Sequence, residues 1–383
     1  MTLHRKLYVA SFLAILGGLG LGAARGLPDY AMPADIGVLD GGLAQSFESH
    51  FNERFPVKQL GINLWAALDY RLFREGRPGV LVGSREWLYS DEEIKPVVGG
   101  QRHMQENLEL IRGVRETLAH QGVQLVMAVV PAKARLYPEY LGEHRPAGLH
   151  TGLYREFHAA LHAADIVAPD LLDPLRQGKG RSLVFLRTDT HWTPRGAQIV
   201  AHQLATEVSR RDLLEETRRF VTETGEAKPH KGDLTNFLPL APLFEELLPQ
   251  PDLLVQHSTR PAEEVGAGAD ALFADSQVPV ALVGTSYSAD ERWNFAGALR
   301  QALGSDLLNF AEDGHGPILP MLKFLQSEEF KNAPPQVVIW EFPERYLPMA
   351  NDLKEFDAGW IAQLRAAGGQ DQLADNQRRQ VRP

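Results

Sequence analysis

The sequence of 383 residues contains no cysteine. This absence excludes disulfide bonds, thiolate metal sites, a cysteine nucleophile and Cys-x-x-Cys redox chemistry. Positive charge is also scarce, because 39 lysines and arginines stand against 49 acidic residues and leave a net charge of −10. A protein that grips the phosphate backbone needs a positive surface, so we expect no nucleic-acid partner.

Long apolar runs are scarce too, and the notable one lies at the N-terminus. Arg5 and Lys6 precede a run from Leu7 to Ala24, a length that suits a long signal-peptide core or a short membrane helix. The positive flank places the N-terminus in the cytoplasm and the body outside it. We predict that residues 1–26 are a signal peptide or an uncleaved signal anchor; a buried helix of a soluble domain is the alternative.

The remaining sequence has the composition of an ordinary globular protein, with 44% hydrophobic and 23% charged residues. This mixture excludes disorder over most of the length and a multi-span membrane protein. Apolar residues at helical spacing predict a helix over 103–120. Buried-type runs predict five strands, at 123–130, 183–187, 278–283, 306–310 and 336–342.

Strands that alternate with helical patterns predict an α/β fold, an open and mostly parallel sheet with helices on both faces. We assign residues 27–365 to this domain, and residues 366–383 to a flexible C-terminal tail because they lack apolar periodicity.

Chemistry-bearing residues follow two of the predicted strands. Asp189 and His191 come after the strand at 183–187, and Thr193 and Pro194 then suit the N-cap and first position of a helix. Ser286 follows the strand at 278–283. Open parallel sheets place their ligands at the carboxyl ends of the strands, so we expect these side chains to converge at one edge.

Each of these signals has a simpler interpretation. An Asp-x-His pair can be a locally hydrogen-bonded turn, and a serine after a strand can be only a helix cap. A metal could also use Asp189 and His191, although no His-x-x-x-His motif or second cluster stands nearby to complete a ligand set. Residues 284–288 lack the second glycine of a Gly-x-Ser-x-Gly elbow. A Ser–His–Asp hydrolase or transferase therefore remains one interpretation among these.

A family resemblance adds to this pattern. Five segments occur in an order that resembles the alginate O-acetylases of the AlgJ/AlgX type, whose catalytic domain is SGNH-hydrolase-like. They are Trp87–Tyr89, Pro131–Lys133, Asp189–Trp192, Gly284–Ser288 and Trp340–Arg345. The resemblance runs from about residue 35 to 365. The length favours the shorter AlgJ type, because no residues remain for the carbohydrate-binding module of the longer AlgX type.

The sequence departs from ordinary SGNH hydrolases in three ways. The Asp–His pair precedes the serine, so the motif order is circularly permuted, and the pair is Asp-x-His instead of Asp-x-x-His. Thr285 replaces the aspartate of Gly-Asp-Ser. The first two departures belong to the alginate family itself and support the resemblance.

The resemblance implies a periplasmic O-acetyltransferase that adds acetyl groups to mannuronate residues of alginate, within an inner-membrane complex. Ser286 would be the nucleophile, His191 the general base and Asp189 the residue that orients the imidazole. Ser288 remains an alternative nucleophile. The implied partners are a membrane-bound O-acyltransferase and a further periplasmic acetylation protein, and no metal or cofactor is expected.

Five further residues are candidates for contact with the substrate. Lys133 and Arg135 could meet uronate carboxylates or form a solvated basic loop, and Arg345 could line the same edge or pair with Glu341 or Glu344. Trp192 and Tyr287 could stack on a sugar ring or pack in the core. His315, in a loop beyond another strand, is either a turn residue or a site residue.

Two other functions fit the same sequence. A carbohydrate acetylesterase would use the same triad and differ only in the exclusion of water. A non-catalytic scaffold would bind the polymer or hold the complex together.

Overall fold

The structure is a computed structural model that describes residues 3–24, 30–32, 37, 40–54, 58–216, 218–262 and 278–368. The chain divides into two compact units. The first comprises Met1–Arg77 and Asn236–Leu248, and the second comprises Pro78–Thr235 and Pro249–Pro383. The domain predicted over 27–365 includes parts of both units.

The first unit contains α1 (Leu3–Ala24), α2 (Gly42–Arg54), α3 (Lys58–Leu68) and the π-helical turn η1 (Asp69–Phe73). In α1, the segment His4–Gly22 is long and apolar enough to cross a membrane, with a mean hydropathy of 1.2. This helix is compatible with the export signal or anchor predicted from the sequence.

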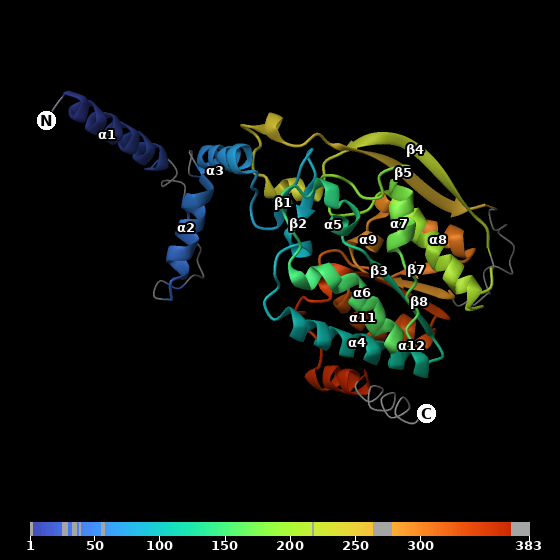
Figure 1. The fold of residues 1–383 in the computed structure, drawn as a ribbon. Coiled ribbons are helices and arrows are strands. Elements are labelled where there is room, and N and C mark those ends of the chain that lie inside the picture. Colours follow the sequence, from blue (N-terminus) through green and yellow to red (C-terminus); the bar gives the residue numbers. More distant parts are fainter. Residues whose placement is uncertain are drawn as a thin grey trace. The chain divides into compact units, whose positions relative to one another are not determined.

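The second unit is built on a four-stranded parallel sheet in the order β3-β8-β6-β7 (Figure 1). Its strands are β3 (Gln124–Val130), β6 (Val280–Val283), β7 (Leu307–Asn309) and β8 (Val337–Pro343). β8 lies at the centre, where Ile339 is in register with Val126 on one side and with Leu282 on the other. The predicted α/β fold with a parallel sheet is confirmed.

Alternating residues of the strands pack into two apolar cores, one on each face of the sheet, because successive side chains point to opposite faces. Val126, Leu282 and Ile339 pack on one face, in the core that α8 (Pro194–Arg210) and α10 (Phe295–Leu303) cover. Met127 and Trp340 pack on the other face, against α4 (Gly100–His120), α6 (Gly148–Ala163) and α11 (Ile318–Gln326). Helices on both faces were predicted, and Figure 1 shows the two layers.

The remaining elements are short or peripheral. Two antiparallel pairs flank the parallel sheet: β1 (Val80–Val82) with β2 (Leu88–Ser90), and β4 (Phe220–His230) with β5 (Asp252–Pro261). The short helices are α5 (Lys133–Leu136), α7 (Leu172–Lys179), α9 (Ser286–Ala289), α12 (Glu328–Asn332), η2 (Asp91–Glu93), η3 (Pro138–Tyr140), η4 (Asp233–Phe237), η5 (Glu245–Leu247), η7 (Glu291–Trp293) and η8 (Glu344–Tyr346).

The prediction of a strand at 183–187 is wrong. Within the described range 58–216, this segment forms only an isolated bridge between Phe185 and Trp192. Its backbone groups bond partly to the residues that follow and partly to side chains. The N–H of Leu186 donates to the carbonyl of His191, and the carbonyl of Val184 accepts from the N–H of Thr193. The Tyr137 hydroxyl accepts from the N–H of Val184, and Lys133 Nζ donates to the carbonyl of Leu186. Because these bonds replace a ladder, the apolar segment lies buried without joining the sheet.

The predicted C-terminal tail begins too early. Residues 358–368 are helical, so the first three residues of the tail predicted over 366–383 belong to a helix. Leu364 is buried, and its carbonyl lies against Gly113 of α4. Residues 369–383 lie outside the described part of the chain.

Gly196 in the first turn of α8 tests how closely this helix must approach the 183–187 segment. A Cβ there would lie 2.2 Å from the carbonyl oxygen of Val184. An alanine in a helix normally stabilises by about 1 kcal/mol relative to glycine, but this clash leads us to expect Gly196→Ala to destabilise by about 1–3 kcal/mol.

The measurement is the free energy of unfolding in urea. Gly148→Ala in α6 is the matched control, because within the described chain no atom lies within 4 Å of its added Cβ. Equal stability of the two variants would contradict the close approach.

Candidate active site

Ser286 lies at the start of α9, directly beyond the carboxyl end of β6. The preceding Thr285 caps this short helix, since its hydroxyl accepts from the backbone N–H of Tyr287. Thr285 is held in turn by Glu341 of the adjacent strand β8, whose Oε2 accepts from the Thr285 N–H at 2.7 Å. The turn that presents Ser286 is therefore anchored to the centre of the sheet.

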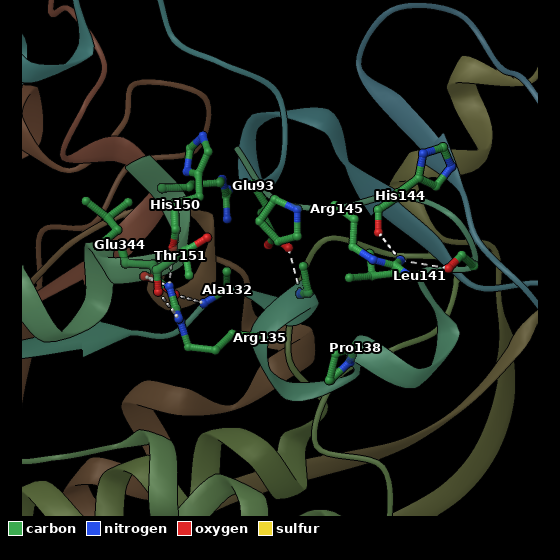
Figure 2. Close-up of a pocket in the computed structure, with 15 residues that line it drawn as sticks. Glu93, Ala132, Arg135, Pro138, Leu141, His144, Arg145, His150, Thr151 and Glu344 are labelled. Carbon is green, nitrogen blue, oxygen red and sulfur yellow. Dashed lines mark hydrogen bonds and ion pairs between the residues drawn. The ribbon is translucent and has the colours of Figure 1, made fainter. Parts of the chain in front are cut away.

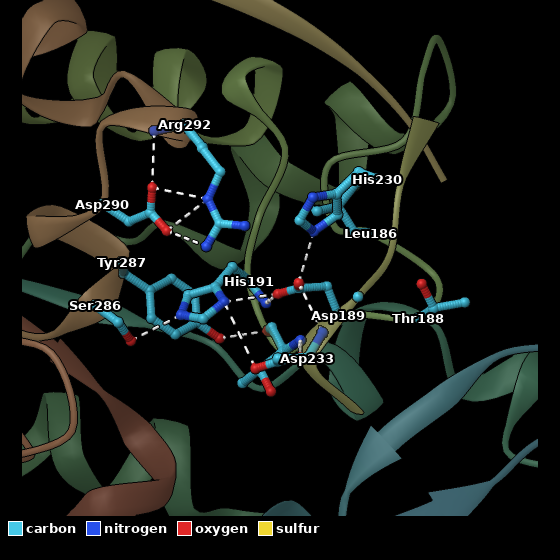
Figure 3. Close-up of polar contacts among 12 residues, drawn as sticks. Leu186, Thr188, Asp189, His191, His230, Asp233, Ser286, Tyr287, Asp290 and Arg292 are labelled. Atoms are coloured by element: carbon cyan, nitrogen blue, oxygen red, sulfur yellow. Dashed lines mark hydrogen bonds and ion pairs between the residues drawn. The ribbon is translucent and has the colours of Figure 1, made fainter. Parts of the chain in front are cut away.

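Ser286, His191 and Asp189 form a hydrogen-bonded chain (Figure 3). Ser286 Oγ lies 2.7 Å from His191 Nε2, and His191 Nδ1 lies 2.6 Å from Asp189 Oδ1. A carboxylate only accepts, so Nδ1 carries the proton and Nε2 accepts from the serine hydroxyl. This is the tautomer that a general base requires, because Nε2 is ready to take the serine proton.

The two candidate serines differ in their surroundings. Ser286 is partly exposed at the surface and faces the imidazole. Ser288 is buried, and its hydroxyl donates to Glu341 Oε2 at 3.1 Å. Burial raises the pKa of Glu341, opposed by its hydrogen bonds from Thr285 and Ser288. The geometry thus favours Ser286 as the reactive hydroxyl and gives Ser288 a role in holding the turn.

The carboxylate of Asp189 accepts four hydrogen bonds. Oδ1 accepts from both the backbone N–H and Nδ1 of His191, and Oδ2 accepts from His230 Nε2 at 2.8 Å and from the N–H of Asp233 at 3.1 Å. Burial opposes the negative charge, but the bonds from His191 and His230 outweigh it and hold the pKa of Asp189 below its usual range. The sequence analysis missed His230, which lies at the end of β4.

Ligand atoms of Asp189, His191 and Asp233 lie close enough together to surround an ion. Their hydrogen bonds point to a different use. His191 Nδ1 carries a proton toward Asp189, and both oxygens of that carboxylate already accept two bonds. A metal would have to displace these donors, so the donor set fits a catalytic triad better than a metal site.

The prediction that Lys133 contacts substrate is contradicted by its burial. Its Nζ donates to three backbone carbonyls, those of Leu186, Arg187 and Asp189, the last at 2.7 Å. Burial lowers the pKa of Lys133 to about 8, opposed by the nearby carboxylate of Glu93. Lys133 therefore binds the backbone of the loop that carries Asp189, and its side chain does not reach solvent.

Three other predicted substrate contacts, Arg345, Tyr287 and Trp192, are also buried. The Tyr287 hydroxyl donates to the carbonyl of Thr190 at 2.7 Å and accepts from Arg345 Nη1 at 3.2 Å. Trp192 packs against the ring of Tyr287. These side chains therefore support the loop of His191 from within the core. None of the three is exposed enough to contact a sugar.

Arg345 also departs from both pairings considered for it. Its Nε donates to Glu92 Oε2 at 3.1 Å, whereas Glu344 pairs with Arg135. Arg135 lines a cavity of about 350 Å³ together with Arg145 and His150 (Figure 2). Its guanidinium is engaged by both carboxylate oxygens of Glu344, at 2.8 Å each. Of the five predicted substrate residues, only Arg135 is both partly exposed and in a cavity.

Aromatic rings complete the surroundings of His191. Its imidazole stacks on the Trp293 ring with centroids 5.0 Å apart and packs against Tyr287 at 4.7 Å. Arg292, half exposed, pairs with Asp290 (Figure 3). Its guanidinium also lies over the Trp293 ring. The sequence analysis missed Arg292 as a cation beside the triad. His315 is exposed, with Nδ1 3.2 Å from Glu312 Oε2.

A second cavity, of about 760 Å³, lies beside Asp290 and Arg292, where the β4–β5 pair faces α9 and α10. Hydroxyl and amide side chains line much of it. They include Thr224, Gln256, Ser258, Thr259, Asn294 and Asn309. Such a lining suits a ligand that carries many hydroxyl groups.

Substitution of Asp189 by asparagine tests the electrostatics of this loop. The folded-state pKa of Asp189 lies below the unfolded value of about 3.9, so its charge stabilises the fold above that pH, and the effect is lost as pH falls toward the folded pKa. We expect Asp189→Asn to lower the free energy of unfolding at pH 7 by about 1–3 kcal/mol.

Urea unfolding at pH 7 and at pH 3 is the measurement, and the difference from the parent protein should shrink at the lower pH. Asp173→Asn is the control, because Asp173 is exposed and forms a surface ion pair with Arg176. A difference that stays constant with pH would show that Asp189 does not carry this charge effect.

The fold and the site are those of a known class of proteins, the SGNH-hydrolase-like acetyltransferases. The family model for the SGNH hydrolase-like domain of the acetyltransferase AlgX matches residues 80–344. The chain therefore belongs to this family of SGNH-hydrolase-like acetyltransferases, and the resemblance noted in the sequence is confirmed.

Particular relatives narrow the class. The chain is 63% identical over 371 residues to the probable alginate O-acetylase AlgJ of Azotobacter vinelandii, an alignment that covers 96% of each chain. It is 54% identical over 373 residues to the AlgJ of Pseudomonas aeruginosa, with 95% of each covered. Among solved structures, the O-acetyltransferase domain of Pseudomonas putida AlgJ matches with a TM-score of 0.71 and 60% identity, covering 76% of this chain and all of that one.

Proposed function

We propose that the protein transfers acetyl groups to mannuronate residues of alginate through an acetyl-Ser286 intermediate. The observation that carries this proposal is the hydrogen-bonded chain from Ser286 Oγ through His191 to Asp189, with the serine partly exposed. The acceptor comes from the relatives, since proteins named alginate O-acetylase match nearly the whole chain.

The first half-reaction loads the enzyme. Ser286 Oγ attacks the carbonyl carbon of an acetyl ester while His191 Nε2 takes the hydroxyl proton. The charge of the imidazolium is balanced by Asp189. As the ester bond breaks, His191 gives the proton to the leaving oxygen, and the acetyl group remains on Ser286. The backbone N–H of Ser286 is our candidate for one oxyanion donor, a contribution of about 10²–10³ in rate.

The second half-reaction delivers the acetyl group. A sugar hydroxyl gives its proton to His191 and attacks the acetyl carbon, the bond to Ser286 Oγ breaks, and the serine takes the proton back. Arg292, the partly exposed cation beside the triad, is our candidate partner for a uronate carboxylate. The polar cavity beside it offers room for sugar units on either side of the reacting one.

We further propose that α1 holds the protein at the periplasmic side of the inner membrane. Its length and composition suit an anchor, and the positive residues ahead of the apolar run favour a cytoplasmic N-terminus. A membrane-bound O-acyltransferase and other periplasmic alginate acetylation proteins are the partners that such a place would allow.

Two serine variants separate the possible functions. Purified protein is incubated with an activated acetyl ester and oligomannuronate, and the mass of the sugar product is measured by mass spectrometry. We expect Ser286→Ala to lose at least about 10³-fold in acetyl transfer, because the variant lacks the hydroxyl that faces His191 Nε2. Ser288→Ala should stay within about tenfold, since its hydroxyl only supports the turn.

The other outcomes point to other functions. Free acetate without a heavier sugar product would identify an acetylesterase. Full alginate acetylation in cells that carry Ser286→Ala would identify a scaffold. Loss of transfer in Ser288→Ala alone would move the nucleophile to that serine.

A further inference from the structure

Helix α3 and the turn η1 that continues it have an inverted amphipathic pattern. On the inner side, Asn63 is fully buried, and its Nδ2 donates to the carbonyls of Pro239 and Ala241 in the same unit. Gln59 Nε2 donates to Asn63 Oδ1 at 3.2 Å and to the Ala241 carbonyl at 3.3 Å. The helix is therefore held to its unit largely by polar bonds.

The outer side of the same helix is apolar. Leucines recur at every fourth position, which places them in one stripe along the surface. Trp65 lies beside the stripe with 69% of its surface exposed, and Phe73 follows at the end with 65%. The leucines, all exposed by 41–66%, are Leu60, Leu64, Leu68 and Leu72. A continuous apolar face of this kind marks a surface that binds another apolar surface.

The charges around this apolar face indicate its occupant. Over residues 58–77 there are four basic and two acidic residues, a local balance of +2 in a chain whose net charge is −10. Three of the exposed basic residues stand near the ends of the stripe: Lys58 before it, Arg71 beside its last leucine and Arg74 after it. A helix with leucine and tryptophan on one face and basic residues at its edges is typical of binding to an anionic lipid surface.

The place of α3 in the chain supports the same occupant. Only 33 residues, 25–57, separate it from α1, which is long and apolar enough to cross a bilayer. Even a fully extended linker of this length reaches at most about 115 Å, so an inserted α1 makes contact between α3 and the bilayer an intramolecular event. The family model begins at residue 80, so this surface lies outside the shared catalytic domain.

We propose that the apolar face of α3 and η1 lies in the headgroup region of an anionic membrane leaflet. The statement that α3 is held near the bilayer rests on the anchoring role proposed for α1. The apolar face of α3 and η1 is independent of the acetyl transfer chemistry. Since η1 ends at Phe73, shortly before the second unit begins at Pro78, a docked α3 confines the catalytic unit to the neighbourhood of the membrane.

The absence of cysteine allows a direct test in the full chain. Leu64→Cys, labelled with an environment-sensitive NBD dye, is reconstituted into vesicles of phosphatidylethanolamine and phosphatidylglycerol. We expect a blue-shifted emission and at least about twofold quenching by lipids that carry a nitroxide near the headgroup, because the label enters that layer. Leu253→Cys is the matched control, an exposed leucine on β5 of the other unit, and should show neither effect.

Several results would overturn the proposal. An emission from Leu64→Cys like that of Leu253→Cys would show that the face stays in water. A blue shift without quenching by the lipid nitroxide would show that protein, such as a second copy or another partner, covers it. A chain that stays in solution and does not float with the vesicles would also contradict it.

A variant with acidic residues on the apolar face separates this proposal from the proposed enzyme function. Leu64→Glu/Leu68→Glu, with the same label placed at Leu60→Cys, should lose the lipid quenching and keep hydrolysis of a soluble acetyl ester. Parallel loss of both would show that the face serves the fold and not the membrane. If the parent chain itself hydrolyses no ester, the enzyme function fails while the quenching result still decides the docking of α3.

Discussion

The carboxylate of Asp189 is the group on which the site depends. Its four hydrogen bonds join three stretches of chain: its own loop through His191, the end of β4 through His230, and the start of η4 through Asp233. Because Oδ2 is occupied by His230 and Asp233, only Oδ1 is directed at the imidazole of His191. The ring is thus fixed in the orientation and tautomer that turn Nε2 toward Ser286.

A buried polar network holds the two loops that meet at this site. Lys133 and Tyr287 bind the backbone of the Asp189–His191 loop, while Glu341 binds the turn of Ser286. Glu93 and Arg345 lie among these groups, and burial raises the pKa of Glu93 against the attraction of Arg345. Such a network is costly to bury and costly to break, since removal of one member leaves its partners unpaired. The buried charged residues of this network therefore hold the two loops in place and are shielded from solvent.

The sheet was predictable because its strands are short apolar runs buried on both faces, such as 123–130 and 336–342. The convergence of Ser286 with His191 was predicted for a reason that is only half correct. Ser286 does follow a parallel strand, but the Asp189 loop follows a segment outside the sheet. That segment bonds to its own continuation at 191–193 and to the side chains of Lys133 and Tyr137. No local pattern shows that the hydrogen bonds of an apolar run go to a turn and to distant side chains instead of a neighbouring strand.

Burial of the charged residues was equally hidden. Lys133 follows a strand end, where a lysine usually points to solvent, and only the tertiary fold places three carbonyls around its Nζ. His230 ends a strand whose side chains are mostly exposed, so no apolar alternation marks it as part of the site. Contacts between residues 40 or more positions apart in the sequence place these side chains, and only the structure shows such contacts.

The most direct measurement is the mass of the protein after brief reaction with an activated acetyl ester in the absence of sugar. The triad predicts one added acetyl group, mapped to the peptide that contains Ser286, and its rapid discharge when oligomannuronate is added. An acetyl group on another residue, or none at all under conditions where sugar becomes acetylated, would contradict catalysis through Ser286.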